Sequence, residues 1–567
     1  MQKSVADLQL KEEDFAEVAA RYPKLAEACK LQRNGKTREA QQIYGELVAV
    51  PALTSICLHQ MAVMAALGND LGRAVDLFRH SLRLDPGQLN AYDGLAFGLA
   101  RVGHKAGALG ALLDKGGHLQ TTGRFAQAQA PYREMLAVDP LYYGAYVNLG
   151  TCLALLHQLP EALWHLLGAL DVYGRMDTTI ADFCDVLRQC LADKGIRVAP
   201  VRLPAGHPTG AIEKIEDAIT TLGKVMTELR LPQEAILCHR RALLMAPGFA
   251  LAHWNLSLAL LMVGDFSEGW QEYEWRWHWQ GFPESSRRLP FQKWRGEPLK
   301  GKSIFVWAEQ GFGDAMQFAP LVRRLTAAGA QVVFEVTTPL FRLFQSSLPE
   351  VSVVERSADG VVPALHRPCD FAAGLLSLPN LLALQCDELP LASKYFFVPQ
   401  GIQKRWVAAV PDGDAMRVGI VWAGRPIPDL RRTISYALLT PLFNRRTFRW
   451  FSLQVGTQEN EIPIVGNAAI EKLGAKLTDF AETAAAMERM DLIITIDSAT
   501  AHLAGGLGKE VWLLLPWVTD WRWAESVDGS PWYPSMRIFQ QPFEGNWSAV
   551  IDAVGHALDA LENPVKQ

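Results

Sequence analysis

A carboxylate follows a glycine-rich turn in the middle of the chain. The segment EQGFGD (309–314) comes directly after a short apolar run and precedes an amphipathic stretch. Gly311 and Gly313 let the backbone pass close to a ligand, because glycine carries no side chain. Asp314 is expected at a helix N-terminus, which favours its ionised form and suits a general base. A helix cap is the simpler role for the same residue, and the local sequence leaves both roles open.

A second polar loop, DSATAHLAGG (497–506), follows another apolar run. Asp497, Ser498 and Thr500 come where a strand gives way to a helix, so hydroxyl groups and free backbone N–H groups are placed to hold a phosphate. His502 lies one helical turn further on and would point the same way. A capped helix with a satisfied histidine is the alternative. The Lys-Ser/Thr pair of a nucleotide-binding P-loop is missing.

Arginines follow the apolar run that ends near 421. Arg425, Arg431 and Arg432 could neutralise a diphosphate through paired hydrogen bonds, and solvated surface charge is the alternative. Gln454, at the end of the next apolar run, is a weaker candidate for the same site.

Two segments are rich in tryptophan. The segment WQEYEWRWHW (270–279) is expected to pack a helical repeat against the following domain, and sugar stacking is the less favoured reading. The segment WVTDWRW (517–523) follows the last apolar run of the chain. It is expected at the mouth of a cleft, where contact with a substrate and packing are about equally favoured.

The elements that must position these residues alternate between strand and helix. Apolar runs at 303–307, 331–336 and 351–355 predict strands, with a short helix around 339–347. After the polar stretch at 411–416 the alternation restarts. Further strands are expected at 417–424, 449–456, 491–497 and 511–516, and helices at 435–443, 481–489, 498–507 and 548–562. Two Rossmann-like lobes of parallel sheet follow, with ligands at the carboxyl ends of the strands.

The first half of the chain repeats itself. Small residues that open a helix recur 34 residues apart in three groups: Ala40, Ala74 and Ala108; Ala128 and Ala162; Ala235 and Gly269. Pro86, Pro140 and Pro247 each lie 12 residues after one of these alanines. A 34-residue period of two helices is that of the tetratricopeptide repeat. Such an array stacks into a curved solenoid whose concave face binds a peptide or protein.

These patterns divide the chain into five parts. We expect an N-terminal repeat array at 1–195, an irregular connection at 196–212, further repeats at 213–280, one α/β lobe at 281–410, and a second lobe with a closing helix at 411–567.

Composition excludes several classes of function. A net charge of −5 gives no reason to expect nucleic acid as a partner. No apolar run is long enough to span a membrane, and the polar N-terminus is unlike a secretory signal. The eight cysteines form no C-x-x-C pair and no cluster with histidine. We therefore expect reduced thiols, no metal site and a cytoplasmic protein.

The quoted loops, together with EQGFGDAMQF, FSLQVG and the stretch from 491 to 523, resemble the heptosyltransferase-like glycosyltransferases of GT-B fold. With the repeats, the chain resembles bacterial proteins that fuse tetratricopeptide repeats to such a domain, some of which glycosylate flagellin. The resemblance implies an inverting, metal-independent transfer from a nucleotide sugar, with no cofactor. The family's phosphate-region lysine is replaced here by Arg431 and Arg432, so ADP-heptose is not the expected donor.

The resemblance also implies roles for the candidate residues. Asp314 takes the place of the catalytic base. Donor binding falls to Trp422, Gly424, Arg425, Arg432, Gln454, Asp497, Ser498, Thr500 and His502. The acceptor side or the cleft comprises Glu309, Gln310, Gly311, Gly313, Trp517, Asp520 and Trp521.

The sequence thus favours a protein glycosyltransferase whose repeats bind the acceptor, with flagellin as the candidate. Two alternatives remain open. One is a transferase for a glycan or lipid-linked acceptor of surface polysaccharide assembly, whose repeats bind an assembly partner. The other is a non-catalytic scaffold that keeps the fold and docks a client.

Overall fold

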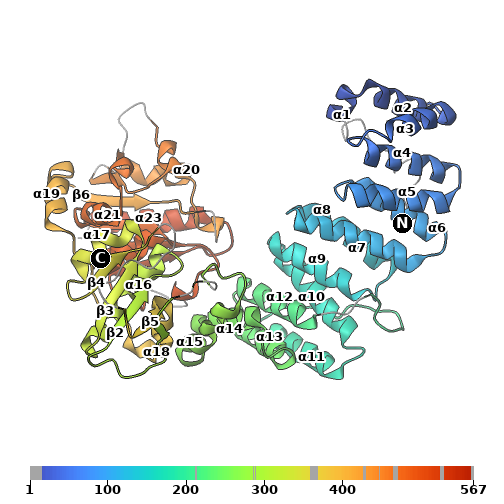
Figure 1. Cartoon of the computed structure of the whole chain (residues 1–567). Helices are drawn as coiled ribbons and strands as arrows, with labels where there is room; N and C mark the ends of the chain where they lie inside the picture. The colour runs from blue at the N-terminus through green and yellow to red at the C-terminus, as the bar shows by residue number, and fades with distance from the viewer. Residues whose placement is uncertain are drawn as a thin grey trace. The chain divides into compact units, whose positions relative to one another are not determined.

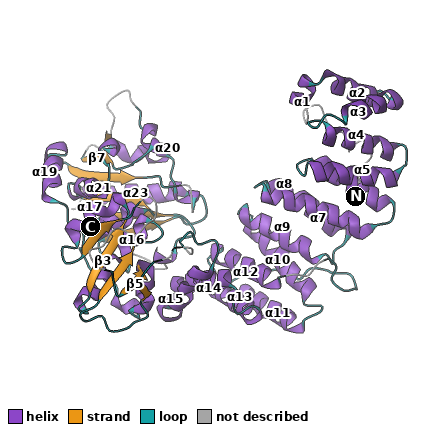
Figure 2. Cartoon of the chain, viewed as in Figure 1, coloured by secondary structure: helices purple, strands orange, loops and turns teal. Residues whose placement is uncertain are grey.

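The computed structural model describes residues 16–210, 214–284, 287, 289–357, 368–425, 429–445, 447–463, 470–523 and 529–562. It separates into two compact units, Met1–Pro247 and Gly248–Gln567 (Figure 1). The first unit is drawn as helices and loops, and the second mixes helices with strands (Figure 2).

The first unit is a stack of antiparallel helices. In chain order these are α1 (Ala16–Arg21), α2 (Pro23–Arg33), α3 (Thr37–Leu47), α4 (Thr54–Leu67), α5 (Leu71–Leu84), α6 (Leu89–Arg101), α7 (Lys105–Thr121), α8 (Phe125–Val138), α9 (Tyr143–Leu155), α10 (Leu159–Tyr173), α11 (Thr178–Asp193), α12 (Ile215–Glu228) and α13 (Pro232–Met245).

The alanines that define the 34-residue period mark the helix crossings. Ala40, Ala74, Ala108, Ala128, Ala162 and Ala235 are all completely buried. Four residues after three of them, a larger side chain covers a glycine of the preceding helix: Tyr132 over Gly116, Leu166 over Gly150 and His239 over Gly223. Because a Cβ atom on these glycines would collide with the covering side chain, the small residues allow the helices to approach closely. The predicted repeat array is confirmed.

The connection between α11 and α12 is irregular, as its proline and glycine content predicts, and it is fixed to the repeats. Arg175 donates hydrogen bonds to the carbonyl oxygens of Pro204 and Gly206 at 2.7 and 3.0 Å. The Val201 N–H donates to Asp171 Oδ2 at 3.0 Å, and the Thr209 N–H donates to the Leu141 carbonyl at 2.9 Å. Residues 211 and 212 of the predicted connection, and residue 213 after it, lie outside the described residues.

The second unit begins with α14 (Ala250–Met262), α15 (Phe266–Tyr273) and the 3-10 turn η3 (Glu274–His278). The structure therefore places these last repeat helices with the α/β region, whereas the sequence grouped them with α12 and α13. The reason is aromatic packing: Trp270 is buried edge-on against Phe318 and Trp521, with ring centroids 5.7 and 5.4 Å apart. This is the packing role expected for segment 270–279.

The N-terminal lobe, green to yellow in Figure 1, holds a five-stranded parallel sheet of order β1-β5-β2-β3-β4. Its elements are β1 (Gln292–Lys293), β2 (Ser303–Trp307), α16 (Phe312–Ala327), β3 (Gln331–Val336), α17 (Thr338–Ser347), β4 (Ser352–Glu355), β5 (Phe371–Gly374), η4 (Leu375–Ser377), α18 (Leu378–Leu381), η5 (Cys386–Glu388) and α19 (Gln400–Ala409).

The C-terminal lobe, orange to red, holds a six-stranded parallel sheet of order β11-β10-β9-β6-β7-β8. Its elements are β6 (Met416–Val421), η6 (Leu430–Arg432), α20 (Tyr436–Leu439), η7 (Thr440–Asn444), β7 (Phe448–Ser452), η8 (Thr457–Glu461), β8 (Ile470–Lys472), η9 (Gly474–Lys476), α21 (Phe480–Glu488), β9 (Leu492–Ile496), α22 (Ala499–Gly506), β10 (Val511–Leu515), η10 (Trp521–Trp523), β11 (Met536–Gln540) and the closing helix α23 (Trp547–Glu562).

Strand order locates the ligand positions. Numbered within its own lobe, the second sheet has the order 6-5-4-1-2-3 of a doubly wound Rossmann fold, which reverses between β6 and β9. The first sheet reverses between β2 and β5. Ligands of such sheets bind where the order reverses, outside the carboxyl ends of the strands. The predicted fold class, a helical-repeat solenoid followed by two Rossmann-like lobes of GT-B type, is confirmed.

Three further expectations concern what the chain lacks. In the part of the chain that the structure describes, no helix is long and apolar enough to cross a bilayer. No group of three or more His, Cys, Asp or Glu side chains among the described residues could hold a metal ion. All eight cysteines are free thiols, and Cys386 is the exposed one.

The glycine packing of the repeats makes a testable prediction on one helix. In Gly116→Ala, the new methyl group overlaps the buried Tyr132 ring, whose hydroxyl donates to Gln120 at 2.7 Å. We expect a loss of about 1–3 kcal/mol in the free energy of unfolding, measured by urea denaturation followed by circular dichroism. Gly110→Ala on the same helix meets nothing within 4 Å and should be neutral or stabilising. Equal stability of the two variants would contradict this packing.

Candidate functional site

The two reversal points face each other across the junction of the lobes. The N-terminus of α16, which follows β2, approaches the N-terminus of α22, which follows β9. A Cβ atom on Gly313 would lie 2.7 Å from His502 Cδ2 and 3.5 Å from Ala499 Cα, so the glycine permits the approach. An ion pair between Asp314 and Arg522 joins the lobes at the same place.

Asp314 occupies the third position of α16 and fulfils the capping role that the sequence allowed. Its Oδ2 atom accepts a hydrogen bond from the Gly311 N–H at 2.8 Å. Its Oδ1 atom accepts a hydrogen bond from Arg522. The side chain is 16% exposed, so the carboxylate is reached by solvent and is not sealed in the core. The neighbouring Gln310 is exposed and donates to the Tyr273 hydroxyl at 2.8 Å.

Arg522 is the functional residue that the sequence analysis missed. Its guanidinium donates to Asp520 Oδ1 at 2.7 Å and to Gln317 Oε1 at 2.8 Å, in addition to Asp314. It also lies over the Trp521 ring, 4.3 Å from the centroid. Burial opposes its charge, but the Asp520 and Asp314 carboxylates outweigh burial and hold the pKa of Arg522 above its ordinary value. The arginine therefore stays cationic at the centre of the junction.

The loop at the start of α22 combines a carboxyl group with hydroxyl groups. Burial and the nearby Asp520 raise the pKa of Asp497 to about 6, although Trp523, Arg432 and Arg522 oppose the increase. The Thr500 hydroxyl is 2.6 Å from that of Ser498 and 2.8 Å from that of Thr495. Among the described residues, the Ser498 side chain makes no capping bond to α22. The first backbone N–H groups of this helix are thus available to an anion.

His502 is neutral in this setting. Its ring is buried, stacks on Trp523 with centroids 5.1 Å apart, and places Nδ1 3.0 Å from the Tyr533 hydroxyl. Burial, with a smaller contribution from the positive charge of Arg522, lowers the pKa of His502 to about 3. The histidine therefore supports the packing of α22 and supplies no positive charge to the site at neutral pH.

The arginines after β6 separate into two roles. The Arg432 Nε atom is buried and has no hydrogen-bond partner among the described residues, and it lies beside the α-carbon of Gly424. Arg425 is exposed, with its guanidinium 5.4 Å from the Phe312 ring centroid across the junction. Arg431, by contrast, pairs with Asp429 at 3.0 Å and with Glu544 at 3.4 Å. Arg432 and Arg425 are therefore the arginines placed to meet a bound anion.

A cavity of about 340 Å³ lies in the C-terminal lobe, outside the carboxyl ends of its strands. Aromatic rings and polar groups line it: Arg431, Thr433, Pro516, Trp517, Val518, Gln541, Glu544, Gly545 and Trp547. Trp517 is predicted on the acceptor side or in the cleft, whereas the structure places it in this cavity of the C-terminal lobe. An aromatic wall with polar edges suits a flat, polar ligand.

Three predicted ligand residues have structural roles. Trp422 is fully buried in the core of the C-terminal lobe, against Tyr436 at 5.5 Å. Gln454 Oε1 accepts from the Trp422 and Ala423 N–H groups at 3.2 and 2.9 Å, and its Nε2 donates to two carbonyl groups. Trp521 is buried beside Trp270. These residues shape the loops of the site, because their side chains are occupied within the protein.

Glu309, which the sequence places on the acceptor side, also has a structural role. It is fully buried and pairs with the fully buried Arg276 of η3, with Arg276 Nη2 2.9 Å from Glu309 Oε1. Its Oε1 atom also accepts the Leu376 N–H at 2.9 Å. The carboxylate therefore joins the last repeat helix to the carboxyl ends of β2 and β5.

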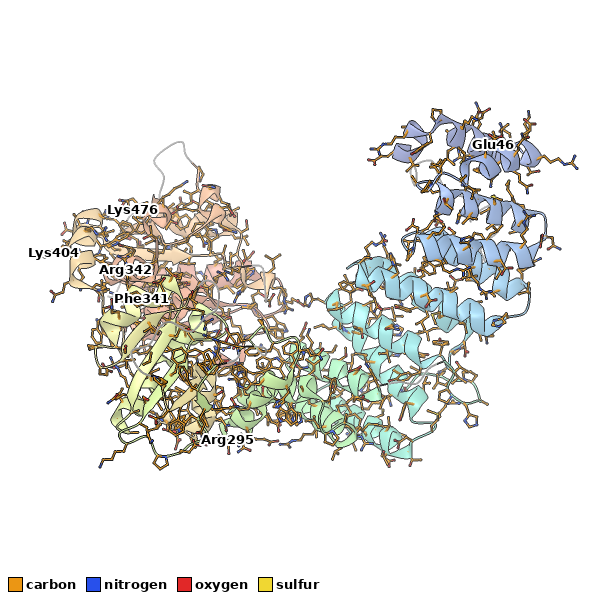
Figure 3. All side chains as sticks on the ribbon, viewed as in Figure 1. Glu46, Arg295, Phe341, Arg342, Lys404 and Lys476 are labelled. Atoms are coloured by element: carbon orange, nitrogen blue, oxygen red, sulfur yellow. The ribbon has the colours of Figure 1, made fainter. Side chains whose placement is uncertain are left out.

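A second cavity, of about 550 Å³, lies between α17 and α21. Figure 3 labels two of its residues, Phe341 and Arg342, on α17. Arg342 pairs with Asp479 at 2.6 Å and with Glu482 at 3.0 Å, so it ties the N-terminal lobe to the C-terminal lobe. Because these charges neutralise one another, this cavity is a weaker anion site than the N-terminus of α22.

Fold and site together define a chain of tetratricopeptide-type helical repeats followed by two Rossmann-like lobes, with a candidate ligand site where the lobes meet. Residues 113–171 match the family model for the tetratricopeptide repeat, a protein-binding repeat. Protein FlbA of Caulobacter vibrioides is 25% identical to this chain over 448 residues, which cover 72% of each protein.

Two solved structures are also similar. They are the E. coli ADP-heptose LPS heptosyltransferase II, at 15% sequence identity, and a glycosyl transferase family 9 protein from Veillonella parvula, at 14%. Each has a TM-score of 0.34 and aligns over 46% of this chain and 98% of the other.

The buried neutral histidine predicts a pH dependence of stability. Below the ordinary pKa of 6.5 the unfolded chain protonates His502, but the native state does not do so until about pH 3. Stability is therefore fully present above pH 6.5 and is lost as the pH falls, by about 2 kcal/mol at pH 5. In His502→Gln we expect a smaller loss between pH 7.5 and pH 5, measured by denaturant unfolding. His556→Gln changes an exposed histidine of the same lobe and should behave as wild type. An unchanged pH dependence in His502→Gln would argue against a neutral His502.

Proposed function

We propose that this protein is a glycosyltransferase that moves a sugar from a nucleotide sugar to a Ser or Thr hydroxyl of another protein. One observation carries the proposal: the Asp314 carboxylate faces, across the lobe junction, a helix N-terminus flanked by Arg432 and Arg522. A base on one side and an anion-binding site on the other are what displacement of a phosphate leaving group requires.

The donor is assigned to the C-terminal lobe. Its nucleoside would occupy the cavity of about 340 Å³ beside Trp517, and its phosphate would meet the N-terminus of α22 and Arg432. Helix N-terminal N–H groups and guanidinium groups both favour phosphate. The cavity and α22 follow adjacent strands of one sheet, β10 and β9, which supports a single ligand spanning both.

The transfer is a single displacement. The acceptor hydroxyl oxygen attacks the anomeric carbon as the bond from that carbon to the phosphate oxygen breaks, and the nucleotide leaves with the bonding electron pair. Asp314 takes the hydroxyl proton. The configuration at the anomeric carbon inverts because attack and departure occur on opposite sides. Guanidinium groups stabilise the leaving phosphate, so we propose a transfer independent of metal and cofactor.

The repeats are assigned to the acceptor protein. Tetratricopeptide arrays bind peptides and proteins on their concave face, and the array accounts for most of the first unit. Flagellin is the candidate acceptor, because the sequence resembles repeat-bearing transferases that modify it.

Intact-mass spectrometry tests the proposed function as a whole. Secreted and flagellar proteins of the native host are compared with and without this gene. A sugar-sized mass loss on one protein supports protein glycosylation and identifies both the sugar and the acceptor. Unchanged protein masses with an altered surface glycan would assign the enzyme to a glycan acceptor, and no change in either would favour a scaffold.

The base assignment makes a sharper prediction. Asp314→Asn keeps the size of the side chain but cannot take a proton, so turnover should fall about 10²- to 10⁴-fold, measured as modified acceptor per unit time. Asp265→Asn is the matched control, because Asp265 caps α15 through the Glu268 N–H at 3.2 Å. Both variants replace a carboxylate that accepts a helix-cap N–H, and Asp314→Asn alone should lose turnover. Near-normal turnover in Asp314→Asn would exclude it as the base.

The cavity predicts a stacking contribution to nucleotide affinity. Trp517→Ala removes one aromatic wall and should weaken the binding of UDP or CMP, whichever binds the wild type, by about tenfold or more in calorimetric titration. Trp517→Phe retains a ring and should recover most of the affinity. If alanine and phenylalanine behave alike, stacking is not the basis of binding in this cavity.

A further inference from the structure

Both oxygen atoms of the proposed base are occupied. Asp314 Oδ2 holds the Gly311 N–H at 2.8 Å and Oδ1 holds Arg522. An acceptor hydroxyl must reach one of these oxygen atoms before its proton can be transferred, and the guanidinium group of Arg522 covers Oδ1. Release of Arg522 from Asp314 would therefore open this oxygen atom to the acceptor.

Other acceptor groups bind Arg522 and would keep it in place if its contact with Asp314 broke. Asp520 accepts from Nη1 at 2.7 Å and from the Arg522 backbone N–H at 3.0 Å, and Gln317 accepts from Nε at 2.8 Å. Asp314 is bound through the remaining nitrogen, Nη2. The contact with Asp314 can thus exchange for another acceptor without releasing Asp520.

The competing acceptor has a place to bind. Arg522 is near the start of α22, since its charge acts on both Asp497 and His502. The N-terminus of α22 and Arg432 attract an anion to this position. A phosphate there offers several acceptor oxygens to a guanidinium, which can bind two of them at once.

We propose that the phosphate of the nucleotide substrate takes the Arg522 Nη2 contact from Asp314, so that donor binding itself frees the base. This inference rests on the proposed function. Arg522 is then a switch between two anions: it restrains Asp314 in the empty enzyme and stabilises the leaving phosphate in the loaded one. Activation of the acceptor hydroxyl follows donor binding as a consequence.

Because Asp314 and the phosphate compete for the guanidinium group of Arg522, the inference predicts whether each substitution raises or lowers nucleotide affinity. UDP and CMP are titrated separately, by calorimetry, into the full-length wild type, Asp314→Asn, Arg522→Gln and the double variant. Asp314→Asn removes the competitor, so the affinity for the nucleotide that binds should increase by about five- to tenfold. Arg522→Gln should reduce that affinity by about 30-fold or more.

The double variant separates competition from simple charge repulsion. When Arg522 is absent, Asp314→Asn should change the affinity less than about twofold, because the two effects act through the same contact. An equal gain in both backgrounds would show repulsion alone and overturn the inference. An unchanged or weaker affinity in Asp314→Asn would also overturn it.

Two more variants guard against a merely structural effect. Arg522→Lys keeps the charge but not the fork of N–H groups, so it should fold if Arg522→Gln does not and should show a smaller coupling with Asp314. Arg417→Gln is the matched control: Arg417 also pairs with two aspartates, Asp412 and Asp491, at the opposite end of β6. Its nucleotide affinity should equal that of the wild type.

If neither nucleotide binds the wild type at millimolar concentration, the nucleotide donor of the proposed function fails together with this inference. Nucleotide binding without coupling overturns the inference alone.

Discussion

The ion pair between Asp314 and Arg522 depends on a steric condition that the backbone must meet first. The two helix N-termini can approach only because Gly313 has no side chain at the point where His502 lies. The same condition recurs along α22, where Gly505 lies under the Tyr533 ring and Gly506 under Phe396, so that a Cβ atom on either would overlap an aromatic ring. Gly313 and Gly506 thus let the two lobes approach, whereas Gly505 allows close packing within the C-terminal lobe, and the charged contact then determines which groups meet.

The loop that carries Arg522 is fixed from the side of the last repeat. Trp521 packs edge-on against Trp270 of α15, and Trp523 stacks on His502 of α22. Tyr273 of α15 accepts from Gln310, and Arg276 of η3 pairs with Glu309, so the glycine-rich loop rests on α15 and the turn that follows it. Helix α15 therefore supports both sides of the junction. This explains why the terminal repeat belongs to the second unit, and why the sequence period alone placed the boundary differently.

Sequence periodicity predicted most of the fold and part of the site. The strands at 303–307, 331–336 and 511–516 are observed close to their expected bounds, because each is a continuous apolar run in a doubly covered sheet. Short strands such as β5 (Phe371–Gly374) and β8 (Ile470–Lys472) escaped notice, since three or four residues give no period.

Spacing placed Asp314 and the DSAT loop at helix N-termini, where they are found. Whether a side chain faces ligand or protein depends on its partners, so Trp422, Gln454 and Glu309 could not be assigned from spacing. Arg522 stands between two tryptophans in the sequence, and its contacts with residues far away in the chain identify it as part of the junction.

The charges at the junction raise the question of why an anion would enter a site that contains carboxylates. Asp314, Asp497 and Asp520 gather there against Arg432 and Arg522. Burial and Asp520 raise the pKa of Asp497, so this carboxyl group opposes an anion less than an exposed aspartate would. The N-terminus of α22 makes the potential at the site more positive, because its peptide dipoles add positive potential without adding a titratable group. In the proposed reaction, a phosphate that pairs with Arg432 and Arg522 also separates Arg522 from Asp314, so the repulsion between phosphate and carboxylate is largest at the proposed base. Proton transfer from the acceptor to Asp314 would remove that repulsion and so favour completion of the proposed transfer.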